Sequence, residues 1–482
     1  MSMEKEIRNT KEKSFSSINF KSFISVIIVL TCIIALSGIL TLIIPQGSFS
    51  RDANGQIIAG TFVKGEVSGI EFWRVITAPF RVFIEDGGIT IIMISLFLLV
   101  MSGVFNLLDK TSGLKVIMNT MVKRFGTKKK LVICACVLFF MLFGSLFGLF
   151  EELVTLLPFI VMFMLSLGFD TMTGLGVCLL ASCFGFSAAI TNPFSVGIAS
   201  SFAGISAVSG LWLRIVFFAL TYALVCIFLI RYTNKLSKSP QLSLSFDVDE
   251  EKRKSLDLQL SQNSAKHKRI FKVYTTFFAI EFLVLILTAV IREISGFAVP
   301  ILAGTFLIGG IISGLLVVDK KKDVFKHIGN GALSMLPAVL LIALASSVNL
   351  IMQESGILDT IMNFAITFLQ GKPVFVCALL IYAFILFLQI FIGSASAKIF
   401  LIMPILIPIC SVIGISPTLL ILIYCMADGF SDVILPTNPV LLIALSMSNV
   451  SYGKWVKWTW KMQLMILLLS FATIFFAVQI GF

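Results

Sequence analysis

The sequence predicts an all-α polytopic membrane protein made of two inverted repeats. Hydrophobic residues fill 58% of the 482 positions and charged residues only 13%, whereas a soluble chain is roughly a quarter charged. Apolar stretches of about 20 residues, long enough to cross a bilayer, recur along the chain. A Thr-Asn-Pro triplet stands inside apolar surroundings twice, at 191–193 and 437–439. The net charge of +12 is assigned to segments that flank the membrane, so no nucleic-acid partner is expected.

The hydropathy pattern predicts nine segments that cross the membrane completely and two apolar blocks that are too long for one crossing. The nine predicted spans are 22–44, 87–108, 173–202, 211–231, 271–291, 297–318, 331–353, 417–447 and 461–482. Lys and Arg concentrate in the tail 1–21 and in the segments 109–130 and 231–272, which the positive-inside rule places in the cytoplasm. This orientation is consistent only if the blocks 131–166 and 374–411 each enter and leave on the same side. Both are therefore predicted to be re-entrant helical hairpins, the first from the cytoplasm and the second from the opposite side.

The two halves of the chain match under a shift of 246 residues, which brings Thr191-Asn192-Pro193 onto Thr437-Asn438-Pro439 and Gly168 onto Gly414. The matching predicts a first repeat over 22–231 and a second over 271–482. Each has a hairpin followed by a broken helix, which runs over 173–202 in the first repeat and 417–447 in the second. The polar segment 232–270 is predicted to be a cytoplasmic linker, and the external stretch 45–72 a small β-hairpin.

Paired inverted repeats with interrupted helices are the layout of secondary transporters, whose binding sites lie near the membrane midplane. A proline inside a span frees backbone groups, and irregular backbone is tolerated at that depth only around a cavity or inside protein. Asn192 and Asn438 supply amides at these breaks. The breaks are therefore the predicted centre of the binding site.

The first hairpin tip, FGSLFGLFEELV, carries Glu151 and Glu152. Intramembrane ionisable residues are functional by default. Acids in the first turn of a returning helix also complement its dipole, so a capping role stays open beside a binding role.

The second tip, IFIGSASAKIF, places Lys398 where the first repeat has Glu152. A cation in the first turn of a helix opposes the dipole, so capping does not explain Lys398. It must pair with an acid or contact a ligand, and the sequence leaves both open. Ser394 and Ser396 offer hydroxyls beside it, although serines also serve close helix packing in membranes.

Asp428 and Asp432 lie four residues apart in YCMADGFSDVILPTNP, on one face of the predicted helix. Two carboxylates so close repel, unless one is protonated or a cation lies between them. The repulsion would be relieved by a proton, by Na⁺, by Lys398 or by a cationic substrate. The structural alternative is a pair of aspartates facing water near the outer mouth.

Three segments together resemble the YfcC family, which contains basic amino acid antiporters of the arginine/ornithine type. They are ADGFSDVILPTNPVLLIALSMSNVSYGKWVKW (427–458), LFGLFEELVTLLPFI (146–160) and TNPFSVGIAS (191–200). The resemblance covers nearly the whole chain and implies an elevator-type carrier with two hairpins and two broken helices in its moving domain, commonly a homodimer. The site residues that it implies are Glu151, Thr191, Asn192, Ser394, Ser396, Thr437 and Asn438. At the second tip the family has a small polar run where this chain has GSASAKI, and this departure keeps an anionic substrate open.

The sequence therefore predicts a secondary active transporter of the plasma membrane, with a cytoplasmic N-terminus and a small polar metabolite as substrate. A basic amino acid antiporter is the leading hypothesis, and an ion-coupled carrier of an anionic metabolite, such as a C4-dicarboxylate or a short-chain carboxylate, is the alternative. Na⁺ near Asn192 and Asn438, or H⁺, is left open as the coupling ion. Paired dead-end hairpins argue against a channel, and the chain has no HExxH, intramembrane GxSxG or Walker A motif that would indicate an enzyme or an ATP-driven pump.

Overall fold

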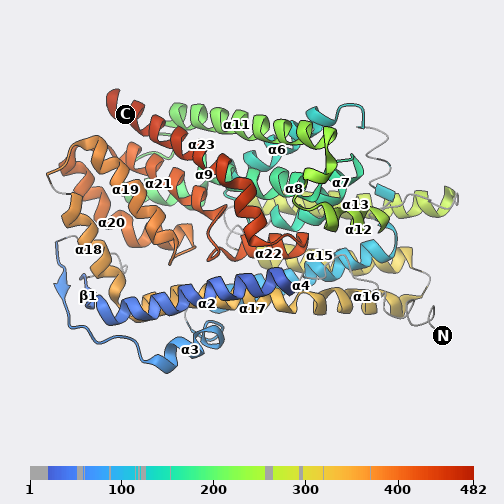
Figure 1. Ribbon diagram of the computed structural model, residues 1–482, viewed down its shortest axis with the longest axis horizontal. Coiled ribbons are helices and arrows are strands. Elements are labelled where there is room, and N and C mark those ends of the chain that lie inside the picture. Colours follow the sequence, from blue (N-terminus) through green and yellow to red (C-terminus); the bar gives the residue numbers. More distant parts are fainter. Residues whose placement is uncertain are drawn as a thin grey trace.

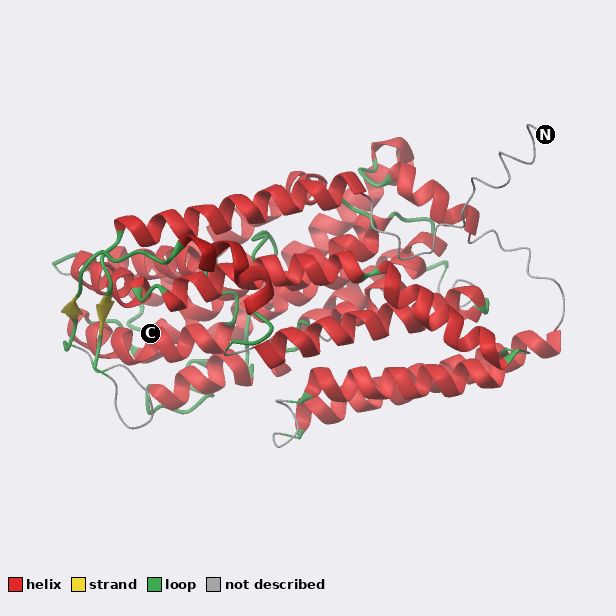
Figure 2. Ribbon diagram, turned by 90° about the horizontal axis from the view of Figure 1, so that it is seen from below, coloured by secondary structure: helices red, strands yellow, loops and turns green. Residues whose placement is uncertain are grey.

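The computed structural model describes residues 20–50, 58, 60–85, 88–113, 116–117, 120, 126–151, 153–255, 264–291, 297–318, 320–369 and 371–482. Most of the predicted tail 1–21 lies outside these ranges, as does Glu152. The described part is an elongated bundle of helices with two short strands at the end where the C-terminus lies (Figure 2). The predicted all-α membrane fold is thereby confirmed.

The first half contains α2 (Phe20–Ile43), β1 (Gly47–Ser48), β2 (Val63–Lys64), α3 (Phe72–Arg81), α4 (Gly88–Lys110), α6 (Lys129–Phe147), η1 (Leu153–Leu156), α7 (Leu157–Ser166), α8 (Thr171–Leu175), η2 (Gly176–Leu180), α9 (Ala181–Ser187), η3 (Pro193–Gly197), α10 (Ile198–Phe202) and α11 (Leu211–Lys238). The second half contains η4 (Pro240–Leu242), α12 (Phe246–Ser255), α13 (Ser264–Val290), α15 (Ala298–Val317), α16 (Lys321–Ser334), α17 (Leu336–Glu354), α18 (Ile357–Leu369), α19 (Val374–Gln389), α20 (Ala395–Ile413), α21 (Pro417–Asp432), α22 (Pro439–Ser448) and α23 (Tyr452–Gln479).

Seven described helices are long and apolar enough to cross a membrane, or eight if the bent pair α16 and α17 forms one span. Two of the seven, α6 and α20, belong to the predicted hairpins, so each hairpin has one arm of spanning length. Four of the nine predicted spans are missing from these seven helices. Both broken spans divide into short helices near Thr-Asn-Pro, the apolar part of α2 is shorter (Ile27–Ile43), and 331–353 belongs to the bent pair α16 and α17. Whether the two hairpins re-enter stays a prediction.

Two predicted helix boundaries need correction. The last span begins at Tyr452 rather than at residue 461, because the hydroxyl of Ser451 accepts the N–H of Lys454 and caps the helix there. The helix predicted at 211–231 continues to Lys238, where basic residues complement the helix C-terminus. The predicted linker 232–270 contains helical structure, since η4 and α12 lie within it. The small β-hairpin predicted in 45–72 is present: Gly47–Ser48 pairs antiparallel with Val63–Lys64.

The helices divide into an outer group and a central group. Helix α17 packs against α2 and α3, and α4 packs against α15 and α16; these run together along one side of the molecule (Figure 1). In the central group, α9 packs against α6 and α21, and α21 also packs against α19 and α23. Every residue of α8, η2 and α9 is buried, and so is α21 from Leu419 to Asp432. The two broken helices therefore form the core of the molecule.

The two halves share local backbone geometry at matching positions. Gly168 and Gly414 both end their hairpins in the left-handed region, at φ 90° and 89°. The next residue donates its N–H five residues back in both cases, from Phe169 to Met164 and from Ile415 to Cys410. A polar side chain then caps the following helix: Asp170 accepts from Thr173, and Ser416 accepts from Leu419. These matched Schellman ends and caps support the predicted duplication.

The hairpins lie toward opposite ends of the molecule. Helices α7 and α8 lie toward the end that holds α12, whereas α18, α19 and α20 lie toward the other (Figure 1). Inverted repeats predict this placement. We expect cysteines that replace Ser166, the last residue of the first predicted hairpin, and Val412, which is 90% exposed and follows the second, to react with impermeant maleimides from opposite faces of the membrane. The experiment uses a protein in which all nine native cysteines are replaced, and it compares labelling in intact and inverted vesicles. Reaction of both positions from one face would contradict the inversion.

Candidate functional site

The first break, at Thr191-Asn192-Pro193, is held by the first hairpin. The carbonyl of Ser145 in α6 accepts the N–H groups of Ile190, Thr191 and Asn192, at 3.0, 3.3 and 3.1 Å. The Asn192 side-chain oxygen accepts the N–H of Phe194 at 2.9 Å and caps the helix that begins after the break. The backbone groups freed by the break thus find partners inside protein, as membrane burial requires. The Asn192 Nδ2 is buried without a hydrogen-bond partner among the described residues.

The first hairpin tip lies directly against this break. Gly148 ends α6 in the left-handed region at φ 70°, and a Cβ at this position would collide with Asn192 Oδ1. Only glycine permits both the conformation and the close approach.

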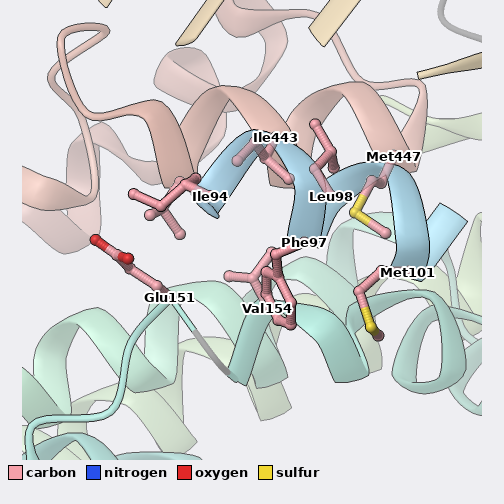
Figure 3. A pocket seen from close by; sticks show the side chains of 9 residues that line it. Ile94, Phe97, Leu98, Met101, Glu151, Val154, Ile443 and Met447 are labelled. Carbon is pink, nitrogen blue, oxygen red and sulfur yellow. The ribbon is translucent and has the colours of Figure 1, made fainter. Parts of the chain in front are cut away.

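Glu151 lies beside a small apolar pocket, which is lined by Phe97 of α4, Val154 of the first hairpin and Ile443 of α22, among others. Its carboxylate points away from these apolar side chains (Figure 3). The first tip therefore meets the outer group of helices as well as the first break.

The second break has the same cap as the first and a more polar environment. The Asn438 side-chain oxygen accepts the N–H of Val440 at 2.9 Å, and its Nδ2 donates to Asp432 Oδ1 at 2.8 Å. Gln389, at the end of α19, donates to the same oxygen at 2.7 Å. The Thr437 hydroxyl donates to the Gln389 carbonyl at 3.4 Å. The second hairpin, α21 and α22 are thereby joined at Asp432.

Lys398 has a different partner from the Asp432 cluster. It lies in the first turn of α20, wholly buried, and forms an ion pair with the equally buried Asp428. The Ser394 hydroxyl caps the same helix by accepting the N–H of Ala397 at 3.3 Å, and it lies 3.4 Å from the Ser396 hydroxyl. The cation that opposes the dipole of α20 thus has a fixed counter-charge one helix away.

The two broken helices touch each other between the breaks. The Ser187 hydroxyl in α9 donates to the Met426 carbonyl in α21 at 2.9 Å. Gly429 packs so closely on the Ser187 backbone that a Cβ would collide with it. The contact brings the Asp428–Lys398 pair close to the end of α9. Both halves therefore contribute to one central polar region.

The structure joins most of the predicted site residues in two groups. The group at the first break contains Thr191 and Asn192 against the first hairpin. The group at the second break contains Lys398 paired with Asp428, Asn438 bonded to Asp432, and Thr437 bonded to the Gln389 carbonyl. Gln389 was not predicted, although an amide in the apolar run FLQIF is a usable signal; its Oε1 is buried without a hydrogen-bond partner in the described part of the chain. No group of three or more His, Cys, Asp or Glu that could hold a metal occurs among the described residues.

A helical bundle with two broken central helices and buried charges at their breaks has the layout of a multi-pass membrane carrier. The chain belongs to the family described as "DcuC: C4-dicarboxylate anaerobic carrier", whose model matches residues 23–479. The resemblance to YfcC is confirmed as well. The Escherichia coli (strain K12) protein named "Putative basic amino acid antiporter YfcC" is 27% identical over 76% of this chain and 74% of its own length. An uncharacterised Haemophilus influenzae protein is 29% identical over 82% of this chain and 77% of its own.

Two solved structures are also similar, both of transporters. The Alcanivorax borkumensis YdaH transporter has a TM-score of 0.42 at 17% identity and covers 95% of this chain and 98% of its own. Neisseria gonorrhoeae MtrF, described with a class of antimetabolite efflux pumps, has a TM-score of 0.40 at 15% identity, with coverage of 93% and 94%.

Proposed function

We propose that this carrier exchanges small cationic metabolites, most concretely basic amino acids of the arginine/ornithine type, across the plasma membrane. The observation that carries the proposal is the buried pair between Lys398 and Asp428. The only lysine of the central cluster, within the described residues, is already neutralised by protein, which leaves Asp432 as the remaining carboxyl group. An unpaired carboxyl group favours a cationic ligand, which stabilises its ionised form, over an anionic ligand, which does not.

The name of the E. coli relative agrees with this substrate class, and the family description supports a second candidate. A C4-dicarboxylate would bind if the substrate displaced Asp428 and took Lys398 as its own counter-charge. That exchange of partners would first require breaking a buried ion pair, which is strongly destabilising when it leaves one charge alone. We therefore place the dicarboxylate second.

In the proposed elevator-type cycle the two hairpins and two broken helices move together against the outer helices. The close packing of α9 on α21, and of α6 on α9, supports a single moving body. A homodimer with cytoplasmic N-termini remains part of the proposal, as does coupling to H⁺ or to Na⁺ near Asn192 and Asn438. The unpartnered Nδ2 of Asn192 is a donor, so it is suited to a substrate oxygen rather than to a cation.

Ligand-induced stabilisation tests the substrate class directly. A ligand that binds only the folded protein at 100 times its Kd stabilises it by about 2.7 kcal/mol. We expect arginine, ornithine and lysine to raise the Tm of the purified protein, and succinate and acetate to leave it unchanged at equal concentration and ionic strength. A rise with succinate alone would replace the cationic assignment by the dicarboxylate one.

A further inference from the structure

Helix α12 in the linker between the two halves carries two buried charges. Asp249 is 2% exposed and Lys252 is 6% exposed, although the surrounding sequence, FDVDEEKRKS, is that of a solvated segment. Burying charged groups costs free energy unless each finds a partner. The partners of these two show what the linker contacts.

Asp249 lies at the N-terminus of the first broken helix. Both of its carboxylate oxygens accept the N–H of Thr171, the first residue of α8, at 3.2 Å. The Ser245 hydroxyl donates to Asp249 at 2.7 Å and fixes the carboxylate from its own segment. An anion at a helix N-terminus is favourable.

Lys252 reaches both broken helices at once. Its Nζ donates to the Thr171 hydroxyl at 3.2 Å and to the carbonyl of Ser448 at 2.9 Å. Ser448 is the last residue of α22, so the ammonium lies at a helix C-terminus, where a cation is favourable. One side chain therefore bridges the start of the broken helix in the first half and the end of the broken helix in the second.

The segment before α12 is anchored to the same place. The Ser243 hydroxyl donates to Asp170 Oδ2 at 2.7 Å, and the Tyr232 hydroxyl of α11 donates to the same oxygen at 2.5 Å. Arg253 adds a bond of 2.7 Å to the carbonyl of Phe169. All of these bonds lead to the loop and first turn of α8.

We infer that α12 is a tie that moves with the two broken helices, and that Asp249 and Lys252 are positioning residues that hold the ends of α8 and α22 at a fixed separation during transport. The inference rests on the proposed carrier function, because it assigns α12 to the moving body. The tie lies at the ends of the helices, away from the Lys398–Asp428 pair. It therefore acts on the rate of the conformational change and not on substrate contact.

Two measurements on the full-length protein in proteoliposomes test the tie. In the first, Lys252→Met is compared with Lys252→Arg and with the control Lys235→Met, an exposed lysine at the end of α11. We expect Lys252→Met to lower kcat about tenfold at unchanged KM, the loss typical of one charged hydrogen bond, with partial rescue by Arg. A change in KM without a change in kcat, or a transport rate equal to that of Lys235→Met, would refute the role proposed for α12.

In the second, cysteines replace Phe169 and Arg253 in a protein freed of its native cysteines, and a short bismaleimide joins them. If α12 moves with α8, the joined protein transports at the rate of the unjoined one, and joining restores kcat in the Lys252→Met background. A block of transport on joining would show that α12 stays behind while α8 moves. Rates are taken as ratios to the parent protein with whichever substrate it exchanges, so a wrong substrate class does not affect the outcome. A parent that exchanges no solute would refute the carrier function itself.

Discussion

Replacing Lys398 with alanine is expected to lower transport by about a hundredfold or more, because it leaves the Asp428 carboxylate buried without its counter-charge. The double variant Lys398→Ala/Asp428→Ala removes both charges and is expected to recover transport to within about tenfold of wild type. The coupling energy of this cycle isolates the pair. Uptake per molecule of protein in the membrane measures it, with the exposed Lys461→Ala as the matched control.

A second double-mutant cycle, which pairs Lys398 with Asp432 instead of Asp428, tests whether recovery is specific to the ion pair. Asp432 binds Gln389 and Asn438 and not Lys398, so the double variant Lys398→Ala/Asp432→Ala is expected to stay inactive. If instead neither double variant recovers while succinate competes for uptake in the wild type, Lys398 contacts an anionic substrate. That result would replace the cationic assignment.

Asn438→Ala is expected to lower transport about ten- to a hundredfold while the protein remains in the membrane. The substitution removes both the cap of α22 and one of the two donors to the buried Asp432 carboxylate. Loss of a cap costs about 1 kcal/mol, and a typical hydrogen bond contributes about 0.5–1.5 kcal/mol. Asn192→Ala is expected to act in the same direction through the first break.

The matched control for the asparagines is Thr367→Ala, whose exposed hydroxyl bonds only the carbonyl of Asn363 in its own helix. Membrane levels of each variant are measured beside uptake, so that loss of protein is separated from loss of function. Normal transport by both asparagine variants would make the breaks structural kinks and would move the site elsewhere.

The breaks were predictable because Thr-Asn-Pro is a local signal: proline ends the helix and asparagine caps the next one. The hairpin ends were predictable for the same reason, since Gly168 and Gly414 occupy left-handed positions that favour glycine. These features depend on a few neighbouring residues. Their repetition at one fixed spacing then gave the duplication.

The partners across helices were not predictable. Asp428 and Asp432 share one helix face, and only the register of α20 against α21 decides which of them meets Lys398. The role of Gln389 depends in the same way on where α19 ends beside α21. The polar composition of the linker gave no sign that part of it packs against the broken helices. Its two buried charges are explained only by the ends of α8 and α22, which are distant in sequence.

Counterflow in proteoliposomes tests the central claim most directly. Vesicles loaded with unlabelled ornithine are diluted into labelled arginine, with and without Na⁺, and a carrier that exchanges the two accumulates label above equilibrium. We predict such accumulation, its suppression by external lysine but not by succinate, and its loss in Lys398→Ala. Accumulation of labelled succinate in succinate-loaded vesicles, with none of arginine in ornithine-loaded ones, would contradict it.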